Sequence, residues 1–165
     1  MKSITTYINE KLVLNKNILN KNTKTKYNYH PETKEELQEI IIKLIDEQSM
    51  EDIINLNSID TSEITDMCNL FNGAEGLLKI DISGWDVYKV KNMDSMFKGC
   101  VNLEKIVGIE DLDVSNVENM QDMFRDCEAF NQDLSKWDVS NVWNKSNMFF
   151  YCDIEEKYKP KFKQI

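Results

Sequence analysis

Residues 112–124 read LDVSNVENMQDMF and residues 137–149 read WDVSNVWNKSNMF, and the agreement between these two blocks decides how the chain folds. The same pattern occurs twice more, as IDTSEITDMCNLF (59–71) and WDVYKVKNMDSMF (85–97). The four blocks start 26, 27 and 25 residues apart. A repeat of about 26 residues is typical of a solenoid, in which each unit forms one coil and buries its apolar side against its neighbours.

The four repeats carry the same kinds of residue at the same places. An aspartate stands second in each block, a phenylalanine closes it, and a small residue follows three positions later. These three columns are Asp60, Asp86, Asp113 and Asp138; Phe71, Phe97, Phe124 and Phe149; and Ala74, Cys100, Cys127 and Cys152. Three of the four cysteines therefore share one column, which explains their spacing without any chemistry.

The apolar spacing changes within each repeat. Residues at the start of a block, such as Trp85 and Val87, alternate as in a short strand. Val117, Met120 and Met123 then follow the spacing of a short helix, with Ser115 and Glu118 as its capping box. We therefore predict an α/β repeat fold: a leucine-rich-repeat-like solenoid of about four coils over residues 53–152, with a short parallel strand and a short helix in each coil.

The flanking segments complete this domain plan. Residues 32–52 contain a predicted helix (32–48) with a Thr33–Glu36 capping box and an apolar face formed by Leu37, Ile40, Ile41, Leu44 and Ile45. We expect it to cap the first coil; a detachable partner-binding helix is the alternative. Residues 1–31 are predicted to be a Lys/Asn-rich arm. Residues 153–165 are predicted to be a tail that places Tyr158 and Phe162 under the last coil.

The blocks, and above all the phrase FNQDLSKWDVSNV (130–142), resemble the bacterial surface-protein repeat known as BspA-like or DUF285. The resemblance covers about residues 53–152 and implies a leucine-rich-repeat-like solenoid with a parallel sheet on one face. Members of the family are often adhesins or ligand-binding surface proteins, and short forms are similar to proteins of bacterial viruses and mobile elements. The family implies no catalytic site, so the Asp, Trp and Phe columns are interpreted as scaffold.

Charge and composition narrow the function classes. The chain has 165 residues, 41% of them apolar, and a formal charge of −9. Residues 35–152 carry 9 basic and 24 acidic residues, which predicts repulsion of nucleic acid and attraction to a basic protein surface. No apolar stretch of about 18 residues and no secretory signal is visible. We therefore expect no membrane contact and a cytoplasmic location, or the host cytoplasm if a virus encodes the chain.

Strand alternation predicts that the Asp column lies on the outer face of the sheet. Carboxylates on neighbouring strands stand roughly 5 Å apart and repel one another, so something must offset that repulsion. Three explanations remain open from the sequence. Each aspartate accepts a backbone N–H two residues on in an Asx-turn, calcium bridges the column, or a basic protein ligand covers it.

Specificity is expected at positions that differ between repeats. Tyr88 stands where the other repeats have serine and is the first candidate for an exposed aromatic anchor; Trp143 is the second, unless it packs against the tail. The predicted partner-binding residues on this acidic sheet face are Asp60, Asp86, Tyr88, Glu110, Asp111, Asp113, Lys136 and Asp138.

The sequence thus predicts a monomeric, non-enzymatic protein-binding module without a cofactor, a metal or catalytic residues. Two alternatives are an acidic decoy, from a virus or mobile element, that blocks a nucleic-acid-binding surface of another protein, and a surface adhesin-type ligand binder. A thiolate ladder for a soft metal is the alternative reading of the cysteine column. We expect instead that Cys100, Cys127 and Cys152 are buried, reduced and metal-free.

Overall fold

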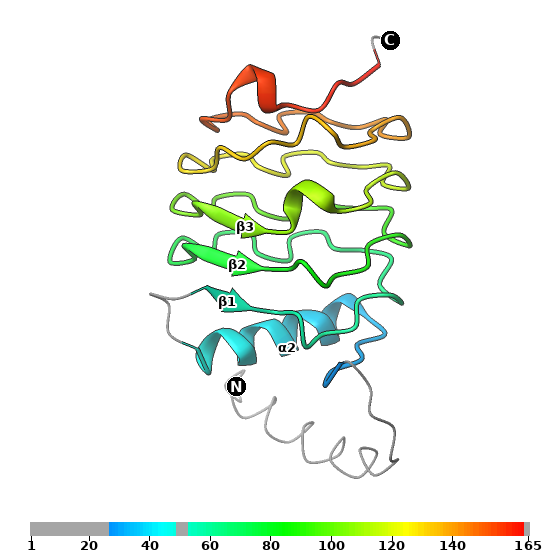
Figure 1. Cartoon of the computed structure of the whole chain (residues 1–165), viewed down its shortest axis with the longest axis vertical. Helices are drawn as coiled ribbons and strands as arrows, with labels where there is room; N and C mark the ends of the chain where they lie inside the picture. The colour runs from blue at the N-terminus through cyan, green and yellow to red at the C-terminus, as the bar shows by residue number, and fades with distance from the viewer. Residues whose placement is uncertain (1–26, 49–52, 164–165) are drawn as a thin grey trace, which may run out of the picture.

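A computed structural model describes residues 27–48 and 53–163, which contain one α-helix and a three-stranded parallel sheet. The chain is therefore α/β. Figure 1 shows the repeats lying one above another between the helix at one end and the C-terminal tail at the other. Residues 1–26 of the predicted arm, and residues 49–52, lie outside the described residues.

The helix α2 (Lys34–Asp46) lies within the range predicted for it and begins at the predicted cap. The Thr33 hydroxyl accepts the backbone N–H of Glu36 at 3.2 Å, and the Glu36 carboxylate reaches back to the N–H of Glu32 at 2.9 Å. These bonds satisfy N–H groups that a helix start otherwise leaves unpaired. The face carrying Leu37 and Ile41 is buried against the first repeat, below β1 (Figure 1).

The strands are β1 (Ile54–Asn55), β2 (Lys79–Asp81) and β3 (Lys105–Val107), in the order β1-β2-β3. Ile54, Ile80 and Ile106 are register partners, and all three are buried. The strands thus precede the Asp column, and the prediction that they begin the blocks is wrong. Trp85–Val87 instead enters a turn that the Val90 N–H closes on the Val87 carbonyl at 2.9 Å.

The short helix predicted in each repeat is also wrong: residues 53–163 contain no α-helix. The apolar spacing of three reflects successive turns, such as the bond from the Met96 N–H to the Met93 carbonyl at 3.3 Å. Ser95, between these two residues, has a left-handed φ of 55°, which no α-helix tolerates in its interior. A run of turns therefore produces a pattern that resembles helical periodicity.

Backbone hydrogen bonds along these turns join one repeat to the next. The N–H groups of Phe71, Phe97 and Phe124 donate to carbonyls of the following repeat at 2.8–2.9 Å. The acceptors are the carbonyls of Met96, Met123 and Met148. The repeats are thus held parallel and in register far from the three strands.

The phenylalanine column forms the centre of the core. Ring centroids are 5.2 Å apart from Phe71 to Phe97, 5.4 Å from Phe97 to Phe124, and 5.8 Å from Phe124 to Phe149, with the rings nearly parallel. Trp85 and Trp137 also face the core, and their indole N–H groups donate to the carbonyls of Leu56 and Ile109 at 3.1 and 2.8 Å. Buried tryptophan needs such a partner.

The tail packs on the last repeat, as predicted. The Leu134 N–H donates to the Tyr158 carbonyl at 2.8 Å, just where the 3₁₀ turn η2 (Glu156–Tyr158) ends. Tyr158 and Phe162 are partly buried against the core. No helix in the described part of the chain is long and apolar enough to cross a membrane.

The stack predicts unequal costs for truncating its rings. Phe97 is fully buried between two ring neighbours, so Phe97→Ala should lower the free energy of unfolding by about 3–5 kcal/mol. Phe149 is only partly buried at the end of the column, so Phe149→Ala should cost clearly less. Urea denaturation of both variants measures the difference; equal losses would contradict the stacked core.

Candidate functional site

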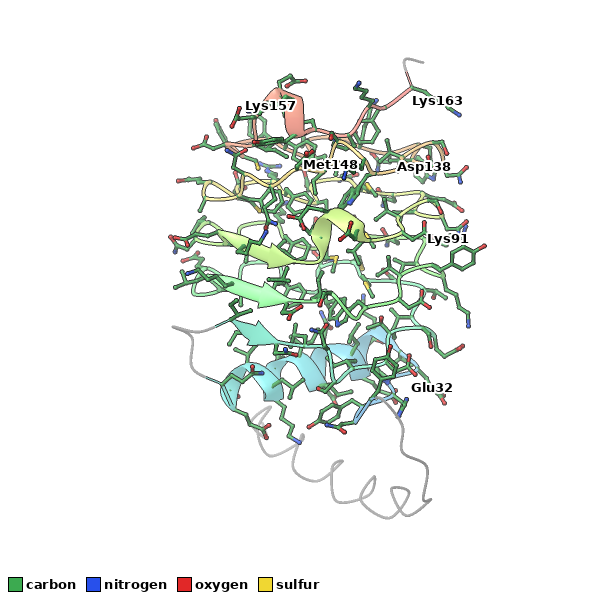
Figure 2. All side chains as sticks on the ribbon, viewed as in Figure 1. Glu32, Lys91, Asp138, Met148, Lys157 and Lys163 are labelled. Carbon is green, nitrogen blue, oxygen red and sulfur yellow. The ribbon has the colours of Figure 1, made fainter. Side chains whose placement is uncertain are left out.

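The four aspartates of the Asp column lie at a corner of the stack and not on the sheet. Asp60, Asp86 and Asp113 follow the turns after β1, β2 and β3, on the side toward which the strand arrows point, and Asp138 marks this side in the last repeat in Figure 2. The predicted acidic sheet face is therefore wrong. The outer positions of the strands are instead mixed in charge, because Lys79 and Lys105 are register partners there beside Asp81.

Each aspartate of the column closes an Asx-turn, which is one of the three explanations left open by the sequence. The carboxylates accept backbone N–H bonds of 3.0–3.2 Å from the residues two positions on: Ser62, Tyr88, Ser115 and Ser140. Hydrogen bonds from Ser140 hold the pKa of Asp138 below its usual value. Asp60 differs because burial acts to raise its pKa, but bonds from Ser62 and His30 outweigh burial and lower it.

Two predicted partner-binding residues lie in the 3₁₀ turn η1 (Ile109–Asp111), not in a strand. Glu110 is half-buried and accepts hydrogen bonds from the Gln132 amide at 2.7 Å and the Lys105 ammonium at 3.1 Å. Burial alone would raise the pKa of Glu110, but these and a backbone bond lower it. Glu110 is thus part of the scaffold, whereas Asp111 is exposed.

The predicted partner-binding residues that remain exposed include Tyr88 and carboxylates of three successive repeats. We name the set Asp86, Tyr88, Asp111, Asp113 and Asp138 the Asp corner; all five are exposed. Side-chain amides join neighbouring repeats along it: Asn116 donates to the Tyr88 carbonyl at 3.0 Å, and Asn141 to the Ser115 carbonyl at 2.7 Å. These bonds fix the backbone of the corner.

The Tyr88 ring is 59% exposed although its backbone is held at both ends. Lys136 is also exposed, one repeat above Asp111 and in its column, so it adds the one positive charge predicted there. Asp60 lies at the lower end of the column, where the His30 ring nitrogen approaches its carboxylate at 3.2 Å. Asp60 is thus partly neutralised whenever His30 is protonated.

Trp143 lies at the corner of the last repeat and is 68% exposed, so the alternative that it packs against the tail is wrong. Sequence reasoning also missed Phe150 and Tyr151, both of which are exposed. The signal for Tyr151 was present, because it occupies the column of Gly73 and Gly99.

A second Asx column was missed as well. Asp66, Asn92, Asn119 and Asn144 each accept the N–H two residues on, at 2.8–3.3 Å, and pair across repeats as isolated bridges. Their alignment in the four blocks was the available signal. The sequence contained no signal for the role of Gln132. Its side-chain amide accepts the N–H of Ile106 and donates to the Ile106 carbonyl, and Gln132 belongs to none of the columns shared by the repeats.

The cysteine column is part of the core. The thiols of Cys100 and Cys127 are fully buried and donate to the Phe71 and Phe97 carbonyls at 3.1 and 2.9 Å. Burial raises the pKa of Cys100 to about 12 and raises that of Cys127 further. Cys152 is only partly buried, so its predicted full burial is wrong. Among the described residues, no three His, Cys, Asp or Glu side chains are placed to hold a metal ion.

Cysteine reactivity should follow this burial. Cys68 is partly exposed, so a water-soluble disulfide reagent should modify it on the order of 100-fold faster than Cys100 or Cys127 in the native protein. Mass spectrometry of the time course identifies the sites, and urea should make the rates equal. Fast native modification of Cys127 would contradict its buried place.

The Asx-turns predict a difference between two substitutions of Asp86. Asp86→Asn keeps the acceptor, because Asn92 makes the same bond to the Asp94 N–H at 3.1 Å. Asp86→Ala removes it and should lower the free energy of unfolding by about 1 kcal/mol. Denaturation curves of both variants test this; equal losses would assign the effect to charge and not to the turn.

Comparison with known proteins places the chain in a family. The family model described as "Mycoplasma protein of unknown function, DUF285" matches residues 41–160, from the second half of α2 to the tail. No curated protein matches the chain significantly, and no solved structure does. The match covers all four repeats and agrees with the BspA-like resemblance of their sequences. The chain belongs to the DUF285 family.

Proposed function

We propose that the protein is a non-enzymatic, monomeric protein-binding module built on a leucine-rich-repeat-like solenoid of four coils. Hydrogen bonds that recur from each repeat to the next, and the regular spacing of the phenylalanine rings, support four equivalent coils. Solenoids of this kind bind partners on extended faces, because every coil presents the same position side by side. In this chain the surface proposed to bind the partner is the Asp corner, where an exposed residue, Tyr88, differs from its equivalents in the other repeats.

The exposed ring of Tyr88 carries this proposal. Serine occupies the same position in the other three repeats, so the fold does not require an aromatic there. Aromatic side chains on rigid backbone are favoured anchors of protein interfaces, since they bury a large area at a small cost in conformational entropy. Asp86 lies on the same coil as Tyr88, Asp111 and Asp113 lie on the next coil, and Asp138 lies on the one after it.

The partner we propose presents a basic protein surface. Neighbouring cations are already paired, since Lys89 contacts Glu63 at 2.7 Å and Lys91 contacts Glu118 at 3.1 Å. The carboxylates of Asp86, Asp111, Asp113 and Asp138 form no ion pair within 4 Å in the described part of the chain. Such a field raises the association rate, while the buried aromatic contact slows dissociation.

We also place this activity in the cytoplasm. All four cysteines are free, and the thiols of Cys100 and Cys127 are engaged with backbone carbonyls inside the core. Free thiols persist in reducing compartments, which supports this location.

The test uses substitutions that the repeats themselves supply. Tyr88→Ser restores the residue of the other repeats, and Asp86→Asn with Asp113→Asn removes two charges while keeping both Asx acceptors. Captured proteins from a lysate of the native source are compared by quantitative mass spectrometry. The proposal expects one basic protein retained by the wild type and reduced at least tenfold by either change, about 1.4 kcal/mol.

The matched control is Asp81→Asn with Asp133→Asn. Asp81, at the end of β2, and Asp133, in the equivalent column of the last repeat, close the same kind of Asx-turn by bonds from the N–H groups of Ser83 and Ser135 of 3.0 and 2.9 Å. The control thus removes two charges from another corner. If it lowers capture as much as the Asp-corner variants, binding depends on net charge alone and the Asp corner is not the site.

A further inference from the structure

The last repeat has an open backbone edge. In the repeat before it, the N–H groups of every second residue donate upward at 2.8–2.9 Å: Met120 to Asn144, Asp122 to Ser146, Phe124 to Met148, and Asp126 to Phe150. The equivalent donors one repeat later are the N–H groups of Lys145, Asn147, Phe149 and Tyr151. Within residues 27–48 and 53–163, these four N–H groups make no hydrogen bond.

The tail covers only part of this end of the stack. It bonds to the strand side through Leu134 and packs Tyr158 and Phe162 against the core. Val142, Phe149 and Cys152 remain only partly buried, whereas their equivalents in the repeat below, Val117, Phe124 and Cys127, are fully buried. The tail crosses these columns without filling them, because the Lys159 ammonium lies 5.9 Å from the centre of the Phe149 ring and the Lys145 ammonium lies 4.4 Å from that of Phe162. Within the described part of the chain, the backbone edge of the last repeat stays unpaired beneath it.

Three large aromatic side chains stand exposed beside the open edge: Trp143, Phe150 and Tyr151. The last two rings lie 4.1 Å apart, and Arg125 lies over the Phe150 ring at 5.2 Å. Tyr151 is 69% exposed and adopts a left-handed φ of 53°. The other three repeats have Gly73, Gly99 and Asp126 in this column, with φ of 74°, 72° and 58°.

A bulky residue at such a φ is strained relative to the ordinary backbone regions, and an exposed ring regains little of that cost through packing. The other repeats place glycine or aspartate at this position, so the fold does not require an aromatic there. Exposed aromatics next to unpaired backbone donors are the features of a surface that another chain completes.

The charge of this end is opposite to that of the body. Lys145, Lys161 and Lys163 have no carboxylate within 4 Å among the described residues, although Lys163 acts at longer range on Asp138. Figure 2 shows Lys163 at the C-terminal end of the stack. The Lys145 ammonium lies over the Phe162 ring at 4.4 Å but has no anionic partner within 4 Å in the described residues, so an occupant of the open edge that carries carboxylates is favoured.

We propose that this edge binds an extended acidic segment of another protein, which adds to the last repeat as a further layer. Its carbonyl groups accept the four free N–H groups at every second residue, as residues 144–150 do for the repeat below. Its apolar side chains cover Phe149 and contact the three aromatics, and its carboxylates approach Lys145. This surface does not include Tyr88, which carries the proposed function, so Tyr88→Ser distinguishes the failure of one interaction from the failure of the other.

Two peptides from the chain's own repeats serve as probes. Residues 118–126 (ENMQDMFRD) and residues 91–99 (KNMDSMFKG) present equivalent carbonyls to the repeat beneath them, but their formal charges are −2 and +1. With blocked termini, each is titrated into the full-length protein by calorimetry. The acidic peptide should bind at least tenfold more tightly than the basic one.

Amide hydrogen exchange by NMR reports the backbone contact itself. In the free protein the amides of Lys145, Asn147, Phe149 and Tyr151 should exchange rapidly, and saturation with the 118–126 peptide should slow all four. Rapid exchange that the bound peptide leaves unchanged would overturn the proposal. So would protection in the free protein, or self-association through this edge in sedimentation experiments, because either shows that another occupant is already present.

Substitutions locate the side-chain contacts. Trp143→Thr with Tyr151→Gly uses the residues found at Thr65, Gly73 and Gly99 in the same columns, and Tyr151→Gly also removes the left-handed strain. This variant should fold and bind the 118–126 peptide at least tenfold more weakly. Tyr88→Ser is the control and should bind as the wild type does; unchanged binding by the double variant would contradict the proposal.

Discussion

Backbone hydrogen bonding from each repeat to the next is the constraint on which the rest of the structure depends. Only eight of the described residues lie in strands, so most of the pairing between repeats passes through turns, such as the 2.9 Å bond from Phe97 to Met123. Asx acceptors at the corners and left-handed residues between them turn alternate N–H groups toward the next repeat. The core columns of Phe, Met and Cys then stack because the backbones above them are in register.

This arrangement separates scaffold from available surface. Asp86, Asp113 and Asp138 each accept a bond from their own backbone, so the Asp corner holds these carboxylates in the same orientation on three repeats, beside the exposed Tyr88. The same bonding pattern leaves donors unpaired where the last repeat ends, beside Trp143 and Tyr151. Both candidate surfaces follow from the same bonding pattern. The inner repeats pair their backbone groups with one another, and the two proposed surfaces consist of groups that this pairing does not use.

The sequence predicted what depends on repetition and failed where local geometry decides. The repeat columns, the Thr33 cap of α2, the buried Cys100 and Cys127 and the Asx-turns follow from residue type and spacing. The strands were predicted in the wrong place because the alternation of buried residues at Trp85–Val87 also occurs in a turn. The helices were predicted wrongly because successive turns give Met93 and Met96 the same spacing of three residues that a helix would. The prediction of an acidic sheet face failed for the same reason, because it depended on the Asp column lying in the strands. The ties of Glu110 to Gln132 and Lys105 needed coordinates, since they join residues outside the shared columns.

Scalar couplings across hydrogen bonds, from an amide nitrogen to the carbonyl carbon that accepts its proton, test the central claim most directly. They are measured by NMR on the labelled full-length protein. The account predicts couplings from Phe71 to Met96, from Phe97 to Met123 and from Phe124 to Met148. Couplings from these amides to carbonyls four residues earlier in the same repeat would show helices in their place and contradict it.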